Sequence, residues 1–242
     1  PPMQTQHDMV KIDSPRRPAM LNRVIATLRR LFSGKRSVEP IRDTAALRDF
    51  LRTRASYVAQ MTLYGYLRTR AGTRLALLYE DDQFVIATNI AKWHVWLACL
   101  SDLSAYAGGM VCRKGHATEA DVGRLICRMV DEILDETGTP REAGVEFASH
   151  AGRVRARLAL CNWRAQTDDD TSFCESPGAL VYWAPIVDVL KELDEEIVRN
   201  SMRFRWQEIR RQLREALDAA SVMATADLGG GARAGDSRAP LA

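Results

Sequence analysis

The chain has 242 residues, of which 46% are apolar and 27% charged, a balance that excludes a disordered or collagen-like chain. The formal net charge is +3, but residues 1–42 contain nine Lys or Arg against three Asp or Glu. The positive charge therefore belongs to this segment, and residues 43–242 are net negative. The five cysteines are widely spaced and form no C-x-x-C pair, which argues against a disulfide framework or a zinc site. We expect a cytoplasmic protein without metal or cofactor.

Residues 1–42 are predicted to be a flexible basic segment that contains an amphipathic helix at about 18–33. Apolar side chains recur on one face of this helix and arginines lie off that face, a pattern that favours reversible binding to an anionic membrane surface. The residues predicted to bind the membrane are Leu21, Arg23, Ile25, Leu28, Arg29, Arg30, Phe32, Lys35 and Arg36. The alternative is that the helix docks on the protein's own core. The first residues lack the apolar stretch of a secretory signal.

The rest of the chain is predicted to be a single helical domain over residues 43–223. With the basic helix, the all-α multi-helix bundle has about six helices, at 18–33, 44–71, 83–112, 118–137, 142–163 and 180–223. Strand signal is confined to residues 75–79. Asp43 is a candidate N-cap for the helix 44–71, and Gly72 marks its end. Gly65, in the middle of that helix, costs about 1 kcal/mol relative to Ala, so we expect a close helix contact or a ligand there.

The helix 83–112 is apolar on nearly all sides and is predicted to be surrounded by other helices. Its length also suits a membrane span, but Asp102 near the middle of the apolar run and Lys92 before it favour a core helix. His94 and Asp102 lie about two helical turns apart. Together with Tyr64, they are the candidate catalytic residues, for acid–base chemistry. The alternative is that they are core groups satisfied by their neighbours.

The helix 118–137 begins with a capping-box pattern at Thr118 and has the clearest amphipathic stripe in the chain. It carries two i,i+4 carboxylate pairs, Asp131/Asp135 and Glu132/Glu136. Without an E-x-x-H motif on a facing helix, these pairs are interpreted as a solvated acidic face rather than a metal site.

The long C-terminal helix 180–223 is predicted to carry a heptad-like stripe that includes Leu193, Ile197 and Trp206, with Pro185 near its start. A second stripe is basic and consists of Arg199, Arg203, Arg210 and Arg214. Its anionic partner is nucleic-acid phosphate, lipid, an acidic protein patch or the protein's own acidic face at 131–136. Residues 224–242 contain three consecutive glycines and are predicted to be a disordered tail.

An aromatic-rich helix containing His94-Val95-Trp96, followed by an amphipathic acidic helix, resembles the helical chaperones that assist assembly of the respiratory cytochrome bc1 complex. The resemblance covers at most residues 79–140 and rests on this pattern, without a diagnostic motif. The long Arg-rich C-terminal helix departs from it. The resemblance implies a membrane-proximal assembly or scaffold role, and no binding residue is transferred.

No G-x-S-x-G, H-E-x-x-H, Walker A or dinucleotide-binding motif occurs in the chain. The sequence favours a non-enzymatic interaction or assembly factor with a protein partner, peripheral on the inner face of the cytoplasmic membrane. Two alternatives stay open. One is an enzyme, with a hydrolase as the class considered, whose site lies between the helices 44–71 and 83–112. The other is nucleic-acid binding through the C-terminal arginine stripe. The sequence does not indicate an oligomeric state.

Overall fold

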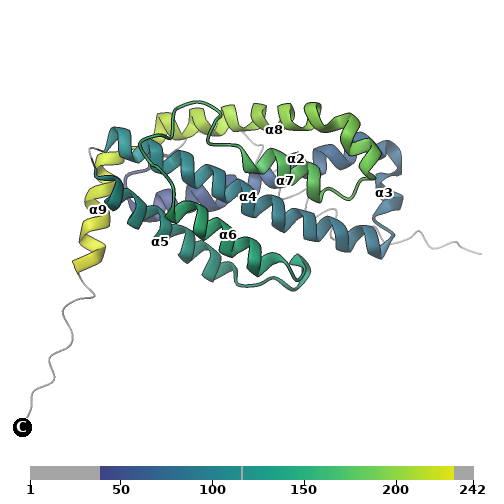
Figure 1. Ribbon diagram of the computed structural model, residues 1–242, viewed down its shortest axis with the longest axis horizontal. Coiled ribbons are helices and arrows are strands. Elements are labelled where there is room, and N and C mark those ends of the chain that lie inside the picture. The colour runs from purple at the N-terminus through teal and green to yellow at the C-terminus, as the bar shows by residue number, and fades with distance from the viewer. Residues whose placement is uncertain (1–38, 116, 232–242) are drawn as a thin grey trace, which may run out of the picture. The chain divides into compact units, whose positions relative to one another are not determined.

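The computed structural model describes residues 39–115 and 117–231, and in this part the chain is all-α, as predicted (Figure 1). The helices are α2 (Thr44–Ala71), α3 (Leu75–Leu78), α4 (Asp82–Lys114), α5 (Glu119–Thr137), α6 (Phe147–Ala159), α7 (Glu175–Trp183), α8 (Asp188–Ala216) and α9 (Ala219–Gly231), with 3-10 turns at Gly72–Arg74 and Arg141–Ala143. The predicted amphipathic helix 18–33 and its membrane-binding residues, including Lys35 and Arg36, lie outside the described residues.

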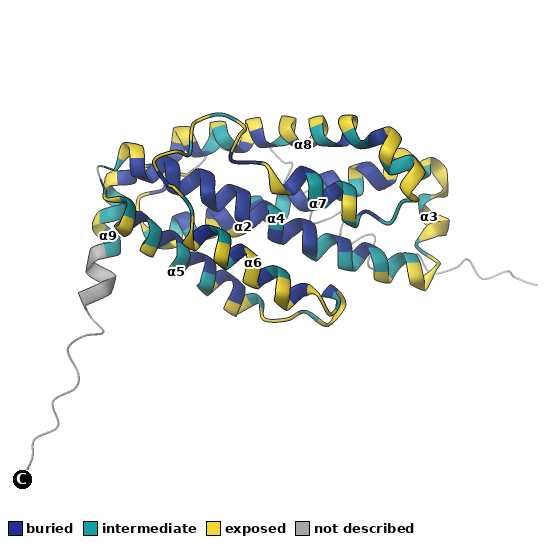
Figure 2. Cartoon of the chain, viewed as in Figure 1, coloured by how far each residue is buried: buried dark blue, intermediate teal, exposed yellow. Residues whose placement is uncertain are grey.

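Helix α4 is the centre of the packing, in contact with α2, α5, α6, α7 and α9. Every residue from Cys99 to Cys112 is buried (Figure 2). Among the described residues, α4 alone has the length and hydropathy of a membrane span, and its most apolar window is completely buried by the other helices. The prediction that it is surrounded by other helices is confirmed.

The helix ends that were predicted from capping residues are present. The Asp43 side chain accepts a hydrogen bond from the Ala46 N–H at 2.7 Å, and Gly72 follows α2 with a positive φ of 53°. Thr118 accepts a hydrogen bond from the Asp121 N–H at 3.2 Å at the start of α5. These local signals fix α2 and α5 to within one residue of the predicted bounds.

The prediction of one helix over 180–223 is wrong, because the segment forms α7, α8 and α9. Pro185 lies between α7 and α8 rather than inside one long helix near its start, since its ring and missing N–H interrupt the helix. The break between α8 and α9 lies where the backbone of Ile41 hydrogen-bonds to residues 216–218. The Ile41 N–H donates to the Ala216 carbonyl at 2.9 Å, and the Asp218 N–H donates to the Ile41 carbonyl at 3.0 Å. Ile41 is buried, so it belongs to the helical domain.

Three further boundaries differ from the sequence prediction. The helix expected at 142–163 is shorter, because residues 141–143 form a 3-10 turn and Gly144 adopts a positive φ of 78°. Residues 75–78, which carried the strand signal, are helical. Helix α9 continues to Gly231, so residues 224–231 are not part of a tail.

Gly108 in α4, and not Gly65, is a glycine that makes room for a close contact. Gly65 is exposed, and a Cβ built on it meets no atom within 4 Å, so the expected close contact there is wrong. A Cβ on Gly108 would overlap the indole ring of Trp163, and the nearest Ile126 side-chain atom would lie 3.2 Å away. The indole therefore packs directly on the α4 backbone.

We expect Gly108→Ala to lower the free energy of unfolding by about 1–3 kcal/mol, because Trp163 has to move from a packed core. Gly65→Ala is the matched control and should raise it by about 0.5–1 kcal/mol, because it restricts the unfolded chain without a steric cost. Urea unfolding of both variants measures the difference. Equal effects of the two substitutions would contradict this account of Gly108.

Candidate functional site

A cavity of about 410 Å³ lies beside α4, between α6 and α7. Its polar and aromatic lining consists of His94 from α4, Glu146, His150 and Arg153 from the α6 region, and Glu175, Tyr182 and Trp183 from α7. This is not the predicted location, which was the interface of the helices 44–71 and 83–112. Of the three candidate catalytic residues, only His94 lines the cavity.

The cavity is built around a pair of histidines. His94 is 1% exposed, and its Nδ1 contacts Nδ1 of His150 within hydrogen-bonding distance. The His94 ring also stacks on Trp183, with 3.7 Å between the ring centroids and an angle of 8° between the planes. Two nitrogens in such contact need one donor and one acceptor, so at least one of the two imidazoles is neutral.

Burial lowers the pKa of His94. The charge of Arg153 lowers the pKa further, and the nearby Ala143 backbone acts in the opposite direction. An imidazole pair with at least one neutral ring, next to a cavity, can accept and pass on a proton. The residues that line the cavity include no serine, threonine or cysteine, so the usual nucleophiles of a hydrolase are not beside the pair.

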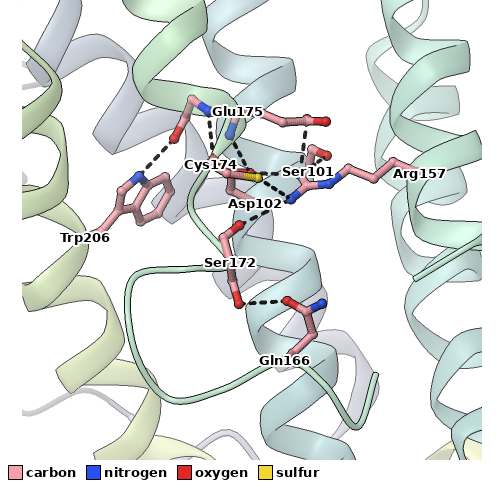
Figure 3. A network of polar contacts seen from close by, with 9 residues as sticks. Ser101, Asp102, Arg157, Gln166, Ser172, Cys174, Glu175 and Trp206 are labelled. Atoms are coloured by element: carbon pink, nitrogen blue, oxygen red, sulfur yellow. Dashed lines mark hydrogen bonds and ion pairs between the residues drawn. The ribbon is translucent and has the colours of Figure 1, made fainter. Parts of the chain in front are cut away.

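Asp102 does not line this cavity but belongs to a neighbouring polar network, which shares Glu175 with the cavity lining (Figure 3). Its carboxylate is fully buried and accepts hydrogen bonds from Nη1 of Arg157 at 2.8 Å and from the backbone N–H groups of Glu175 at 3.2 Å and Ser176 at 2.8 Å. The last two groups are at the N-terminus of α7, so Asp102 caps a helix that is far away in sequence. Trp206 of α8 donates to the Ser176 hydroxyl at 3.0 Å.

Arg157 connects this network to its surroundings. It also donates to the Ser101 hydroxyl at 2.7 Å and to the Ser172 carbonyl at 3.3 Å, and it pairs with Glu175. Burial raises the pKa of Asp102 to about 6, and Arg157 and Ser176 oppose that increase. Each oxygen of the carboxylate already has a partner in the fold. Asp102 is therefore a satisfied core group, which was the alternative to a catalytic role.

Tyr64, the third candidate, is partly buried on α2 and does not line the cavity. Burial raises its pKa, with a smaller contribution from the negative charge of Glu142. Glu142 in turn accepts hydrogen bonds from Lys92 at 2.7 Å and Trp93 at 3.2 Å. His94, Asp102 and Tyr64 thus have three different environments and do not form one site.

The predicted arginine stripe is largely paired within the fold. Arg214 contacts the Asp168 carboxylate at 3.1 Å, and Arg210 donates to the Asp168 carbonyl at 2.7 Å. Arg199 pairs with Glu195 at 2.6 Å. Arg203 is exposed, and its closest polar partner among the described residues is Asn200, at 3.3 Å.

The acidic face of α5 is not the partner of this stripe. Arg155 of α6 bridges Asp131 and Asp135, with 2.8 Å to each. Arg48 of α2 contacts Glu132 at 3.4 Å and Glu136 at 2.6 Å. The two i,i+4 carboxylate pairs therefore hold neighbouring helices, and no group of metal-binding side chains occurs among the described residues.

Helix α8 has two apolar faces, of which only one packs on the core. The buried face consists of Val198, Met202, Trp206, Ile209 and Leu213, with Asp194 among them. The opposite face carries Val189, Leu193, Ile197 and Phe204, which are 68–70% exposed (Figure 2). We call these four residues the α8 stripe. The predicted heptad-like stripe is therefore wrong for Leu193 and Ile197, because it merged residues from the two faces.

Sequence reasoning missed His150 and Arg157 as partners of His94 and Asp102. The partners are separated by 56 and 55 residues, so no local spacing connects them. A usable signal did exist for Arg157. A carboxylate in a fully apolar helix requires a buried cation, and the helix after α5 carries three arginines, at 153, 155 and 157.

We expect the decrease in the free energy of unfolding at acidic pH to depend on His94. Its folded-state pKa is below the unfolded value of about 6.5, so the unfolded chain takes up a proton first and stability is lost as the pH falls below that value. Asp102, with its raised pKa, acts in the opposite direction at lower pH. His94→Phe should therefore be more destabilising at pH 7.5 than at pH 5.5 in urea unfolding. An equal loss at both pH values would contradict the role of His94.

We expect Arg157→Met to lower the free energy of unfolding by about 3–5 kcal/mol at pH 8, because it leaves the Asp102 carboxylate buried without its cation. The pKa of Asp102, about 6 in the intact protein, should rise further without Arg157. The loss should therefore be smaller at pH 5, where Asp102 is protonated. Arg128→Met on the exposed face of α5 is the control. A pH-independent loss would exclude Asp102 as the group responsible.

Comparison with known proteins adds no functional information for this chain. No protein-family model matches it, and no curated protein and no solved structure matches it either. No activity, substrate or partner is therefore carried over from another protein. Its function is inferred from the contacts and exposed surfaces described above.

Proposed function

We propose that the chain is a non-enzymatic helical interaction or assembly factor that binds a protein partner through the α8 stripe. The observation that carries this proposal is the exposure of four large apolar side chains on one face of a helix whose other face is buried. Successive residues of a helix are turned by about 100°, which puts the four within an arc of about 80°. They lie along one side of α8, with the exposed Asn200 between Ile197 and Phe204 on the same side.

Such a surface is unfavourable in water, because each exposed aliphatic or aromatic side chain forgoes roughly 1.5–3 kcal/mol of burial free energy. Aligned exposed apolar residues are typical of sites that bind another protein or a membrane. Tyr182 at the end of α7 and Val187 just before α8 are 71% and 66% exposed, and they precede the stripe directly in sequence. The core of the domain, by contrast, is filled by α4 and its neighbours.

The proposed location is the inner face of the cytoplasmic membrane. Support for this part comes from the sequence of residues 18–36, where apolar residues alternate with basic ones in a helical pattern. The resemblance of residues 79–140 to assembly chaperones of a respiratory complex agrees with a membrane-proximal role. The α8 stripe is the part of this proposal that rests on described residues.

The two alternatives have weaker support. The enzyme hypothesis is left with the cavity at His94 and His150, which lacks Tyr64, Asp102 and a serine, threonine or cysteine. The nucleic-acid hypothesis is left with few available cations, because Arg210 and Arg214 contact Asp168 and Arg199 pairs with Glu195. Both rank below protein binding for these reasons.

We expect affinity capture of the tagged full chain from its native host, with mass spectrometry of proteins and phospholipids, to recover a defined set of protein partners. Leu193→Glu should reduce that recovery at least tenfold, because it puts a carboxylate in the stripe. Leu160→Glu is the matched control, since Leu160 is 87% exposed at the end of α6, outside the stripe. Equal recovery with both variants would contradict binding through α8.

A further inference from the structure

Charge is unevenly distributed along α8. From Asp188 to Glu196 the helix has five acidic residues and one lysine, and from Arg199 to Arg214 it has six arginines and one glutamate. The helix that carries the apolar stripe thus has an acidic first half and a basic second half. Two antiparallel copies of such a helix are complementary, whereas two parallel copies bring like charges together.

The charged residues that border the stripe are available for a partner. Glu192, Glu196 and Arg203 are exposed and lie on the same side of the stripe at 100° per residue. Among the described residues none of the three has an ion-pair partner, and Arg203 contacts only the side chain of Asn200. Glu192 and Arg203 cannot pair within one helix, because eleven residues put them roughly 16 Å apart.

One antiparallel register pairs the two ends of the stripe. A two-fold axis between Glu196 and Ile197 places Val189 opposite Phe204 and Leu193 opposite Asn200 of a second copy. The two Ile197 side chains meet near the axis on one side of the stripe, and the two Glu196 side chains lie near it on the other side. In an antiparallel pair related by a two-fold axis, the same side of each helix faces its equivalent with the direction reversed. Glu192 then lies within about 3 Å, along the axis, of Arg203 of the second copy.

We propose that the partner bound by the α8 stripe is a second copy of this chain, in an antiparallel α8–α8 contact. The contact rests on the proposed function, since it uses the same surface. It buries Val189, Leu193, Ile197 and Phe204 of both copies and forms the Glu192–Arg203 ion pair twice. A second copy of α8 offers both an apolar surface that covers the stripe and charges that pair with those beside it, so no other kind of protein is needed to cover the stripe.

The first test is the oligomeric state of the full chain, by light scattering after gel filtration and sedimentation equilibrium from about 5 to 200 μM. The wild type should be a dimer. Ile197→Glu should weaken dimerisation at least 50-fold with an unchanged circular dichroism spectrum, because it removes the apolar contact at the axis and adds two carboxylates to the Glu196 pair already there. Leu160→Glu should remain a dimer. A wild type that is monomeric at 200 μM overturns the proposal.

The second test is specific to the antiparallel register. E192R and R203E should each weaken the dimer about tenfold at low salt, because each replaces two ion pairs by like charges. An equimolar mixture of the two variants should form a heterodimer about as tight as the wild type, since Arg and Glu then face each other at both contacts. R128E on α5 is the charge-reversal control. Failure of the mixture to restore dimerisation overturns the register.

The two proposals fail separately. A monomeric wild type whose capture of a different protein is lost in Leu193→Glu would overturn self-association and leave the proposed function standing. In the other outcome, the wild type is a dimer, the mixture of E192R and R203E restores dimerisation, and no other protein is captured through the stripe. That result would support self-association and overturn an assembly role toward other proteins.

Discussion

A carboxylate in the middle of an apolar helix must obtain partners from elsewhere in the chain, and Asp102 determines where two other helices lie. Its charge is compensated by Arg157 of α6, and its oxygens accept the first N–H groups of α7. Because both helices are fixed to the same side chain, the space between them is fixed as well. The cavity with His94 and His150 is a consequence of that arrangement, and Asp102 supports it from outside.

Local sequence signals sufficed where a helix begins and ends with its own capping residues. Asp43 and Gly72 mark the two ends of α2, and Thr118 and Gly138 mark the two ends of α5. The breaks at both ends of α8 were not predictable in the same way. Pro185 is compatible with a first turn as well as with a break, and the break after Ala216 depends on a contact with Ile41, which is 175 residues earlier.

The candidate site was harder to predict than the fold, because its contacts join residues that are distant in sequence. The sequence identified His94 and Asp102 as unusual in an apolar helix but could not show that they face different neighbours. Helix α8 illustrates a second limit. Its apolar positions fit a single periodic stripe only when residues from opposite sides are combined, and periodicity alone does not distinguish the buried face from the exposed one.

Asp194 is the one acidic residue on the buried face of α8, where it is held by Arg70 and accepts a hydrogen bond from the Tyr66 hydroxyl at 3.0 Å. These contacts fix the rotation of α8 about its own axis. The outer apolar side chains of the helix therefore stay exposed, because rolling it would break these contacts and expose the buried apolar face. Loss of the Asp194 contacts would loosen the orientation in which the α8 stripe is exposed, without any change in the residues of the stripe itself.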